Sequence, residues 1–282
     1  MSAVSALVRN EIEEHEIFEL VTSWMSRPPQ PNEIESTLRK AMSGTAPTDE
    51  YVPRHKINTL AIERLAAAGP TSCEEIKALS PIDPDKATAV DVLKVLFTKE
   101  EKTIIFTDER SQGQLVWSHA TPQAALDRVL CTNRTGAWFL MNPVSGNFLS
   151  IERLGKSSRR CEENTTSFRY VLVESDNIEI TTWNTIIKQL PLPIAAITMS
   201  GNSSTHAIVR TGASTKTEWV QAARTIAALV VPLGACPGSL TAVRLTRLPQ
   251  VLRTDNQRPQ SLLYLNSKPC SMILRSLTKR TK

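Results

Sequence analysis

The segment Tyr170-Val-Leu-Val-Glu-Ser-Asp176 places two acidic residues directly after four residues that favour a buried strand. In an extended chain, residues two positions apart point to the same side, so Glu174 and Asp176 can face one cation. Mg²⁺ is usually held by one or two carboxylates together with substrate phosphates and water. Two such ions lying close together can activate both the attacking and the leaving oxygen of a phosphoryl transfer. Taken alone, the tripeptide Glu174-Ser-Asp176 also fits the solvent-exposed end of a strand.

A glycine turn follows further along the chain and leads to a histidine, in Ser200-Gly-Asn-Ser-Ser-Thr-His206. Ser204 and His206 are again two positions apart and are expected on one face of a strand. A histidine in this position can donate to a triphosphate or order a water molecule bound to a metal. A single histidine in a strand can equally have a purely structural role.

Three arginines, Arg244, Arg247 and Arg253, are interleaved with apolar residues after this strand. Guanidinium groups match phosphate oxygens two at a time, which makes these residues candidates for phosphate binding. Surface ion pairing is the alternative, but Asp255 is the only acid within ten residues of Arg247. Residues 244–282 contain nine lysines or arginines and one acid, a net charge of +8, so residues 1–243 carry −3 of the total of +5. This asymmetry indicates a polyanionic partner.

The composition excludes several classes of protein. With 282 residues and 41% hydrophobic residues, the chain can form one large or two modest domains with a real core. No apolar run approaches the roughly 18 to 20 residues of a membrane span, and the N-terminus lacks a signal-peptide pattern. Five scattered cysteines without a C-x-x-C pair argue against disulfides or structural zinc and favour a reducing cytoplasm. No P-loop occurs, so a built-in helicase is not predicted.

The organisation changes near a proline-rich segment at residues 80–85. We expect a helical N-terminal module over 1–79, a catalytic domain over 85–267 and a basic tail over 268–282. The patterns in the central part predict an α+β sheet layer with helices on one face and with Trp117, Trp138, Trp183 and Trp219 in the core. The elements expected there are strands at 103–107, 115–117, 137–141, 170–173, 194–199 and 207–210, helices at 124–130, 182–189 and 217–231, and a polar, basic loop at 153–167. Within the N-terminal module we expect helices at 4–26, 33–42 and 57–68, with a capping box at 71–75 that opens a short fourth.

In this order, the segments resemble the archaeo-eukaryotic primase (primase-polymerase) superfamily, in its phage- and plasmid-type bacterial branch. The resemblance covers roughly residues 90 to 267. The segments that carry it are Tyr170–Asp176, Leu190–Ile197, Ser200–Val209 and Ala242–Pro249, with Phe106–Trp117, Gly136–Pro143 and Arg159–Arg169 upstream.

The resemblance implies a catalytic core with an RRM-like mixed or antiparallel sheet. It implies that Glu174 and Asp176 bind Mg²⁺ or Mn²⁺, that Ser204 and His206 contact an incoming NTP or dNTP, and that the arginines grip phosphate. Glu174, Asp176 and His206 are then the catalytic residues of a primase that synthesises oligonucleotides on a nucleic-acid template, with single-stranded DNA expected as that template. Such a protein would act in replication of a mobile element or phage, with a replicative helicase supplied separately and no membrane partner.

Three departures from the family pattern leave the activity open. A third acid would fall at Cys236, and a neutral thiol is a poor ligand for a hard cation. Asn202 and Ser203 replace a glycine and a basic residue in the turn, and Gln250 replaces a glycine after the arginines. The alternative is therefore a degenerate primase-like replication protein that binds nucleic acid or nucleotide without polymerising. Asp255 or Glu218 could take the place of the third acid.

Overall fold

A computed structural model of the chain describes residues 57–108, 113–133, 135–151, 156–202 and 204–268. The chain divides into two compact units, residues 1–55 and 56–282, and the second contains all of the described residues. The helices predicted at 4–26 and 33–42 and most of the predicted basic tail lie outside the described residues.

One four-stranded antiparallel sheet contains the strand predicted at 170–173, in the order β12-β7-β8-β6. All four residues of β6 are buried, because both faces of this sheet are covered. The strands are β6 (Tyr170–Val173), β7 (Ile194–Met199), β8 (Thr205–Arg210) and β12 (Leu262–Leu265). The strands predicted at 170–173, 194–199 and 207–210 are thus confirmed.

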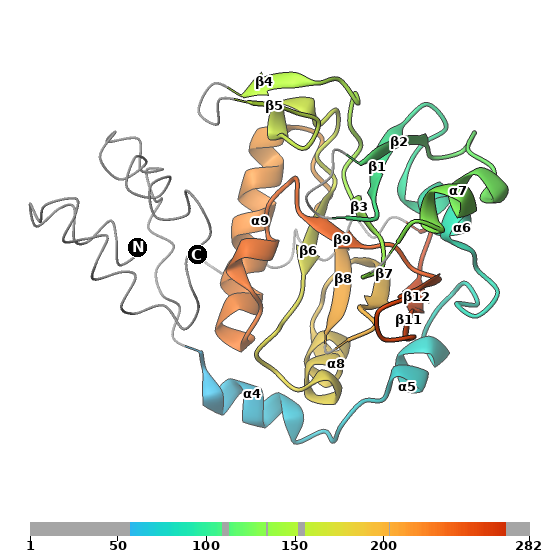
Figure 1. The fold of residues 1–282 in the computed structure, drawn as a ribbon. Coiled ribbons are helices and arrows are strands. Elements are labelled where there is room, and N and C mark those ends of the chain that lie inside the picture. The colour runs from blue at the N-terminus through green and yellow to red at the C-terminus, as the bar shows by residue number, and fades with distance from the viewer. Residues whose placement is uncertain (1–56, 109–112, 134, 152–155, 203, 269–282) are drawn as a thin grey trace, which may run out of the picture. The chain divides into compact units, whose positions relative to one another are not determined.

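Two helices cover one face of this sheet, α8 (Ile180–Gln189) and α9 (Lys216–Val230) (Figure 1). Val171 and Val173 point to this side and pack in one core with Trp183, which is fully buried. Tyr170 and Leu172 point to the other side, into a second core that includes helix α6 (Ala89–Leu96).

A second antiparallel sheet, in the order β2-β1-β3-β9, shares that second core. Its strands are β1 (Lys102–Phe106), β2 (Gln114–Trp117), β3 (Trp138–Leu140) and β9 (Leu245–Arg247). The α+β class is confirmed, and the predicted sheet layer with helices on one face is the first sheet with α8 and α9; the second sheet was not predicted. The short strands of the second sheet, three to five residues long, carry too little periodicity to reveal a separate sheet.

The predicted hairpin at 103–107 and 115–117 is confirmed as β1 and β2, with Lys102 opposite Trp117. The prediction that Trp117 lies in the core is wrong: its side chain is 45% exposed, because β2 is an edge strand and Val116 takes the buried face. The other three tryptophans named above are buried.

The remaining elements flank the sheets. Helices α4 (Thr59–Ala66) and α5 (Cys73–Ala78) contact α8, and Ser72 and Glu75 form the predicted capping box. The predicted domain boundary at 80–85 stays a prediction. The segment predicted as a loop at 153–167 contains a strand, β5, and a 3₁₀ turn, η2. The other elements are α7 (Gln123–Leu130), β4 (Leu149–Ile151), β5 (Lys156–Ser158), η2 (Glu162–Asn164), η3 (Val231–Leu233), η4 (Pro237–Ser239), β10 (Val251–Leu252) and β11 (Pro259–Gln260).

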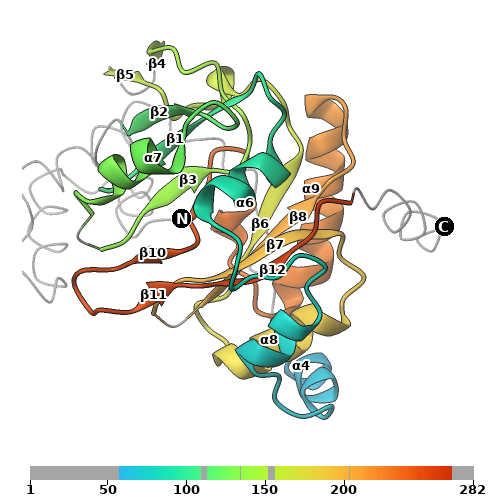
Figure 2. The ribbon, with the colours of Figure 1, turned by 90° about the vertical axis from the view of Figure 1, so that its right-hand side faces the viewer.

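In Figure 2, β10 and β11 run side by side below β3. None of the helices in the described residues is long and apolar enough to cross a membrane.

Candidate functional site

A polar cavity of about 270 Å³ is lined by residues from both sheets. The ends of β6 and β8 contribute one wall, and β3 and β9 contribute the other. The lining residues are Trp138, Arg160, Glu174, Asp176, Ser200, Asn202, Ser204, His206, Arg244, Leu245 and Arg247. Six of the seven residues predicted from the sequence therefore lie in one cavity, and their chemical roles stay predictions.

Glu174 lies directly after β6 and is only 3% exposed. The pairing of Val173 with Ala207 places Glu174 opposite His206, and His206 Nε2 lies 3.0 Å from Glu174 Oε2. The other carboxylate oxygen, Oε1, accepts from Arg244 Nη2 at 2.6 Å. Both oxygens of this buried carboxylate thus have a partner from within the protein.

Asp176 is exposed at the mouth of the same cavity. The thiol of Cys236 lies beside it, with Sγ 3.8 Å from Asp176 Oδ2. Burial raises the pKa of the Cys236 thiol, so this group is protonated at neutral pH. The position where the resemblance expects a third carboxylate therefore carries a neutral hydrogen-bond donor.

His206 is neutral at physiological pH. Its pKa is lowered to about 3, first by burial and then by the positive charges of Arg247 and Arg244. The contact with Glu174 is therefore a hydrogen bond donated by a neutral imidazole, which places the proton on Nε2. Nδ1 is then left to accept from the hydroxyl of Thr246, at 3.4 Å on β9. This pair of contacts fixes the ring between the two sheets.

The arginines of the cavity are held in different ways. Arg247 donates to the carbonyl of Thr135 at 2.8 Å and stacks on Trp138 at 4.1 Å from the ring centroid. Arg160, from the segment after β5, donates to the carbonyl of Val243 at 3.1 Å. Arg160 was not among the predicted site residues; its sequence signal is the basic run at 156–160, within a segment that carries the resemblance.

Arg253, the seventh predicted residue, does not line the cavity. Its guanidinium makes two contacts with the carboxylate of Asp255, at 3.1 and 2.7 Å, and the residue is 8% exposed. Arg244 also has an acidic partner, Glu174, which lies 70 positions away and is therefore not visible among its neighbours in the sequence. The predicted phosphate contact of Arg253 stays a prediction, and the position of Arg253 outside the cavity lining gives it no direct support.

The turn before β8 presents serine and asparagine groups to the cavity. Ser200 N donates to the carbonyl of Ser204 at 2.9 Å, and the Ser200 hydroxyl accepts from the backbone of Asn202 and of Ser204 at 3.3 Å each. The turn is thus closed by its own hydrogen bonds, which leaves the Asn202 side chain exposed at the cavity.

The donor set fits a cation that arrives with a phosphate better than a fully protein-bound ion. Among the described residues, no group of three or more His, Cys, Asp or Glu side chains is placed to hold a metal. Glu174 and Asp176 supply two carboxylates, which is the number that Mg²⁺ commonly uses when phosphates and water complete its shell. Of the possible substitutes for the third acid, Glu218 accepts from Ser214 N at the start of α9, and Asp255 pairs with Arg253. Neither residue lines the cavity.

No protein-family model and no curated protein matches the sequence. Among solved structures, the chain is similar to the AEP domain of the cyanophage S-2L primase-polymerase, with a TM-score of 0.46 and 11% identity over 66% of this chain and 94% of that one. It is also similar to primase RepB′, with a TM-score of 0.42 and 12% identity over 68% of this chain and 63% of that one.

Proposed function

We propose that the cavity binds the triphosphate of a nucleotide together with a divalent cation, and that the protein is a primase-polymerase-type nucleotidyltransferase. It would join NTPs or dNTPs on a single-stranded DNA template during replication of a mobile element or phage. The observation that carries the proposal is the meeting, in one small cavity, of two carboxylates, a neutral imidazole and three guanidinium groups. A cytoplasmic location and a separate helicase complete the proposal and rest on the sequence alone.

The residues divide into two chemical roles. Glu174 and Asp176 would hold Mg²⁺ or Mn²⁺, which supplies charge stabilisation at the transferring phosphate and lowers the pKa of the attacking hydroxyl. Arg160 and Arg247 present forked donors to phosphate oxygens from the opposite wall. The neutral His206 donates a hydrogen bond from Nε2 to Glu174, so it positions this carboxylate without adding positive charge.

We assign the template path to exposed aromatic rings that stack with cations, one of which contacts Arg159, the chain neighbour of Arg160 in the cavity lining. Phe148 is 52% exposed, with the Arg159 guanidinium 4.1 Å from its centroid, and Trp117 lies 4.2 Å from Lys102 Nζ. The segment that leads to Phe148 packs beside Lys102, because Val144 N donates to the carbonyl of Lys102 at 3.0 Å. Single-stranded nucleic acids bind to such surfaces by stacking bases on aromatic rings while cations contact the phosphates.

A primer-synthesis assay tests the proposal. The protein is incubated with Mn²⁺, labelled NTPs or dNTPs and single-stranded DNA, and products are resolved by length. Asp176→Asn is the informative variant, because Asp176 is exposed and its replacement leaves the buried Glu174 cluster intact. We expect oligonucleotides from the natural protein and none from Asp176→Asn. Equal products from both proteins would refute the assigned role of the carboxylates.

Cys236 favours a second candidate function, a protein that binds nucleotide or nucleic acid without polymerising. Its thiol stands beside Asp176 where a third acid is expected by resemblance. The variant Cys236→Asp separates the two: if the natural protein is inert and the variant synthesises, the binding function holds. Synthesis by the natural protein dismisses it.

A further inference from the structure

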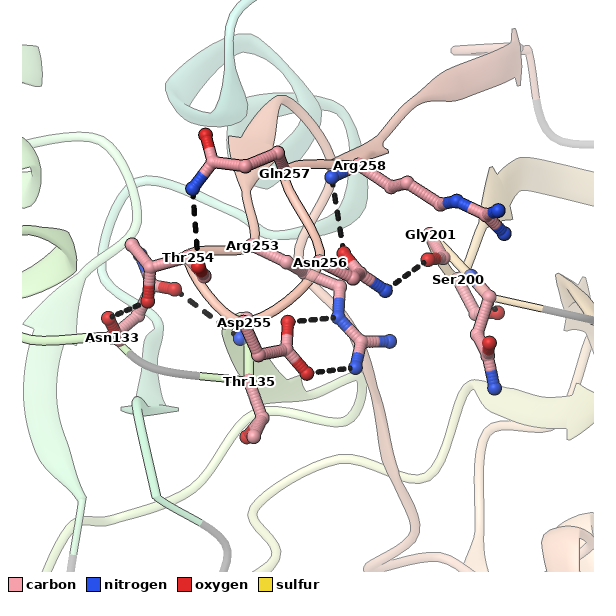
Figure 3. A network of polar contacts seen from close by, with 12 residues as sticks. Asn133, Thr135, Ser200, Gly201, Arg253, Thr254, Asp255, Asn256, Gln257 and Arg258 are labelled. Atoms are coloured by element: carbon pink, nitrogen blue, oxygen red, sulfur yellow. Dashed lines mark hydrogen bonds and ion pairs between the residues drawn. The ribbon is translucent and has the colours of Figure 1, made fainter.

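The turn between β10 and β11, residues 253–258, contacts segments next to both walls of the cavity without lining it, and Figure 3 shows its polar contacts. We call these residues the clamp turn. Its side chains and backbone make hydrogen bonds to two segments that are far apart in the sequence, the turn at 200–204 and the loop at 133–137.

Arg253 gives the clamp turn its shape. Its guanidinium is held by both oxygens of Asp255, and its backbone N donates to the carbonyl of Arg258 at 3.1 Å. Its aliphatic part lies against Gly201, where an added Cβ would stand 2.9 Å from Arg253 Cδ. Gly201 has a φ of 72°, which also favours glycine. The start of the 200–204 turn is therefore shaped to the side chain of Arg253.

Asn256 adds a direct hydrogen bond across the same contact. Its Nδ2 donates to the carbonyl of Gly201 at 3.0 Å, while its Oδ1 accepts from Arg258 N at 3.0 Å. The amide is thereby fixed in orientation by its own turn. The peptide that it holds immediately precedes Asn202, whose side chain faces the cavity.

The β10–β11 hairpin also makes hydrogen bonds to the segment that precedes β3, next to the opposite wall of the cavity. Thr254 Oγ1 donates to the carbonyl of Asn133 at 3.0 Å. The fully buried Gln260 accepts from Ala137 N and donates to Ala137 O, both at 2.8 Å. Thr135, between these anchored residues, supplies the carbonyl that orients Arg247. One hairpin thus supports a donor group on each side of the cavity.

We infer that the clamp turn sets the distance between the two walls for the phosphates of the nucleotide, with Arg253 and Asn256 as positioning residues. This inference rests on the proposed function. It assigns Arg253 a role through Gly201 instead of the direct phosphate contact expected from the sequence. Loss of the clamp contact weakens nucleotide binding while the carboxylates that hold the cation stay in place.

Two glycines of this chain provide a matched test. Gly201 and Gly212 have φ values of 72° and 67°, so alanine costs similar backbone strain at each. An added Cβ at Gly212 meets nothing within 4 Å, whereas at Gly201 it meets Arg253. We expect Gly201→Ala to raise the Kd of a fluorescent ATP analogue with Mn²⁺ by roughly 10-fold, equal to about 1.4 kcal/mol, and Gly212→Ala to leave it within about twofold. Equal Kd values for both variants would overturn the inference.

A second variant avoids any loss of folding, because Asn256 is exposed. Asn256→Asp keeps the size of the side chain but removes the donor to Gly201. In the primer-synthesis assay we expect a several-fold rise in the nucleotide KM with kcat unchanged, and unchanged kinetics would count against the clamp. If the natural protein binds no nucleotide, both the proposed function and this inference are refuted. If it binds nucleotide and neither Gly201→Ala nor Asn256→Asp changes the affinity, only the inference is refuted.

Discussion

The Glu174 carboxylate accepts from Arg244 and from His206 while almost completely buried. A buried carboxylate depends on its cationic partner, because removal of that partner leaves a poorly compensated charge. In the proposed function, a divalent cation would compete with Arg244 for the oxygens of Glu174. A triphosphate would change the balance, because it would offer Arg244 another anion and add ligands to the cation. We expect cation and nucleotide to bind together more tightly than either alone.

The variant Arg244→Gln tests this competition. Without nucleotide, we expect Mn²⁺ to bind about fivefold more tightly, equal to about 1 kcal/mol, because Arg244 no longer competes for the carboxylate. With the nucleotide present, the affinity for the nucleotide falls, since a phosphate donor is lost. Calorimetric titration of Mn²⁺ with and without ATP measures both effects, and Lys86→Gln, which breaks a surface pair with Asp83, is the control. Weaker Mn²⁺ binding in the absence of nucleotide would contradict the competition.

Among the elements, helix α8 connects its N-terminal cap at Glu179 to the cavity through a hydrogen bond in the middle of the helix. Its first turn is capped by Glu179, whose Oε2 accepts from Thr181 N at 2.9 Å and from Thr182 N at 3.0 Å. In the middle of the helix, Asn184 Oδ1 accepts from Thr205 Oγ1 at 2.7 Å. Thr205 immediately precedes His206 on β8, so the position of the helix bears on the position of the imidazole.

The cap of α8 predicts a pH-dependent contribution to stability. Hydrogen bonds from Thr181 and Thr182 lower the pKa of Glu179 to about 2. A carboxylate whose folded pKa is depressed stabilises the protein above its unfolded pKa, near 4.5, and loses that contribution as pH falls towards 2. Glu179→Ala should cost about 1 kcal/mol at pH 7, and the difference should shrink at pH 3.

Urea unfolding of the natural protein, Glu179→Ala and Glu179→Gln at pH 7 and pH 3 measures this effect. Glutamine keeps an acceptor but has no charge to titrate, so it serves as the control. A difference between the natural protein and Glu179→Ala that stays the same at both pH values would argue against the cap.

On the scale of the described unit, the cavity lies where two sheets meet, and the exposed rings of Trp117 and Phe148 lie on β2 and directly before β4. Figures 1 and 2 both show the β4–β5 hairpin next to β1 and β2. The side chain of Leu115 on β2 lies close to Gly146, just before β4, so these elements are in contact. Phe148 and Trp117 therefore lie on neighbouring parts of the fold.

Phe148→Ala should weaken binding of single-stranded DNA by roughly 5- to 150-fold, because one base–aromatic stack contributes about 1–3 kcal/mol. Nucleotide binding should not change, since Phe148 does not line the cavity. Fluorescence anisotropy with labelled oligo(dT) measures the affinity. Leu79→Ala is a matched control, because Leu79 is 54% exposed, like Phe148 at 52%, but follows α5. An equal loss of affinity in both variants would mean that the effect is not specific to Phe148.

The sequence alone determined those features that are written in short stretches of chain. The apolar run of β6, the pairs Glu174–Asp176 and Ser204–His206, and the capping box at Ser72 follow from periodicity and local hydrogen bonding, which depend on near neighbours. Their order along the chain was enough to predict an α+β fold and to select six residues that share one cavity.

Only the tertiary structure decided how those pieces pair. The ion pair of Arg244 with Glu174, the engagement of Arg253 by Asp255 beside Gly201, and the place of Arg160 all depend on contacts between distant segments or on geometry that no period encodes. The second sheet escaped prediction for the same reason: β9 is three residues long and becomes a strand because β3 supplies its hydrogen-bond partners. A side chain's type sets which partner it can accept, but the packing of the two sheets determines which partner is within reach.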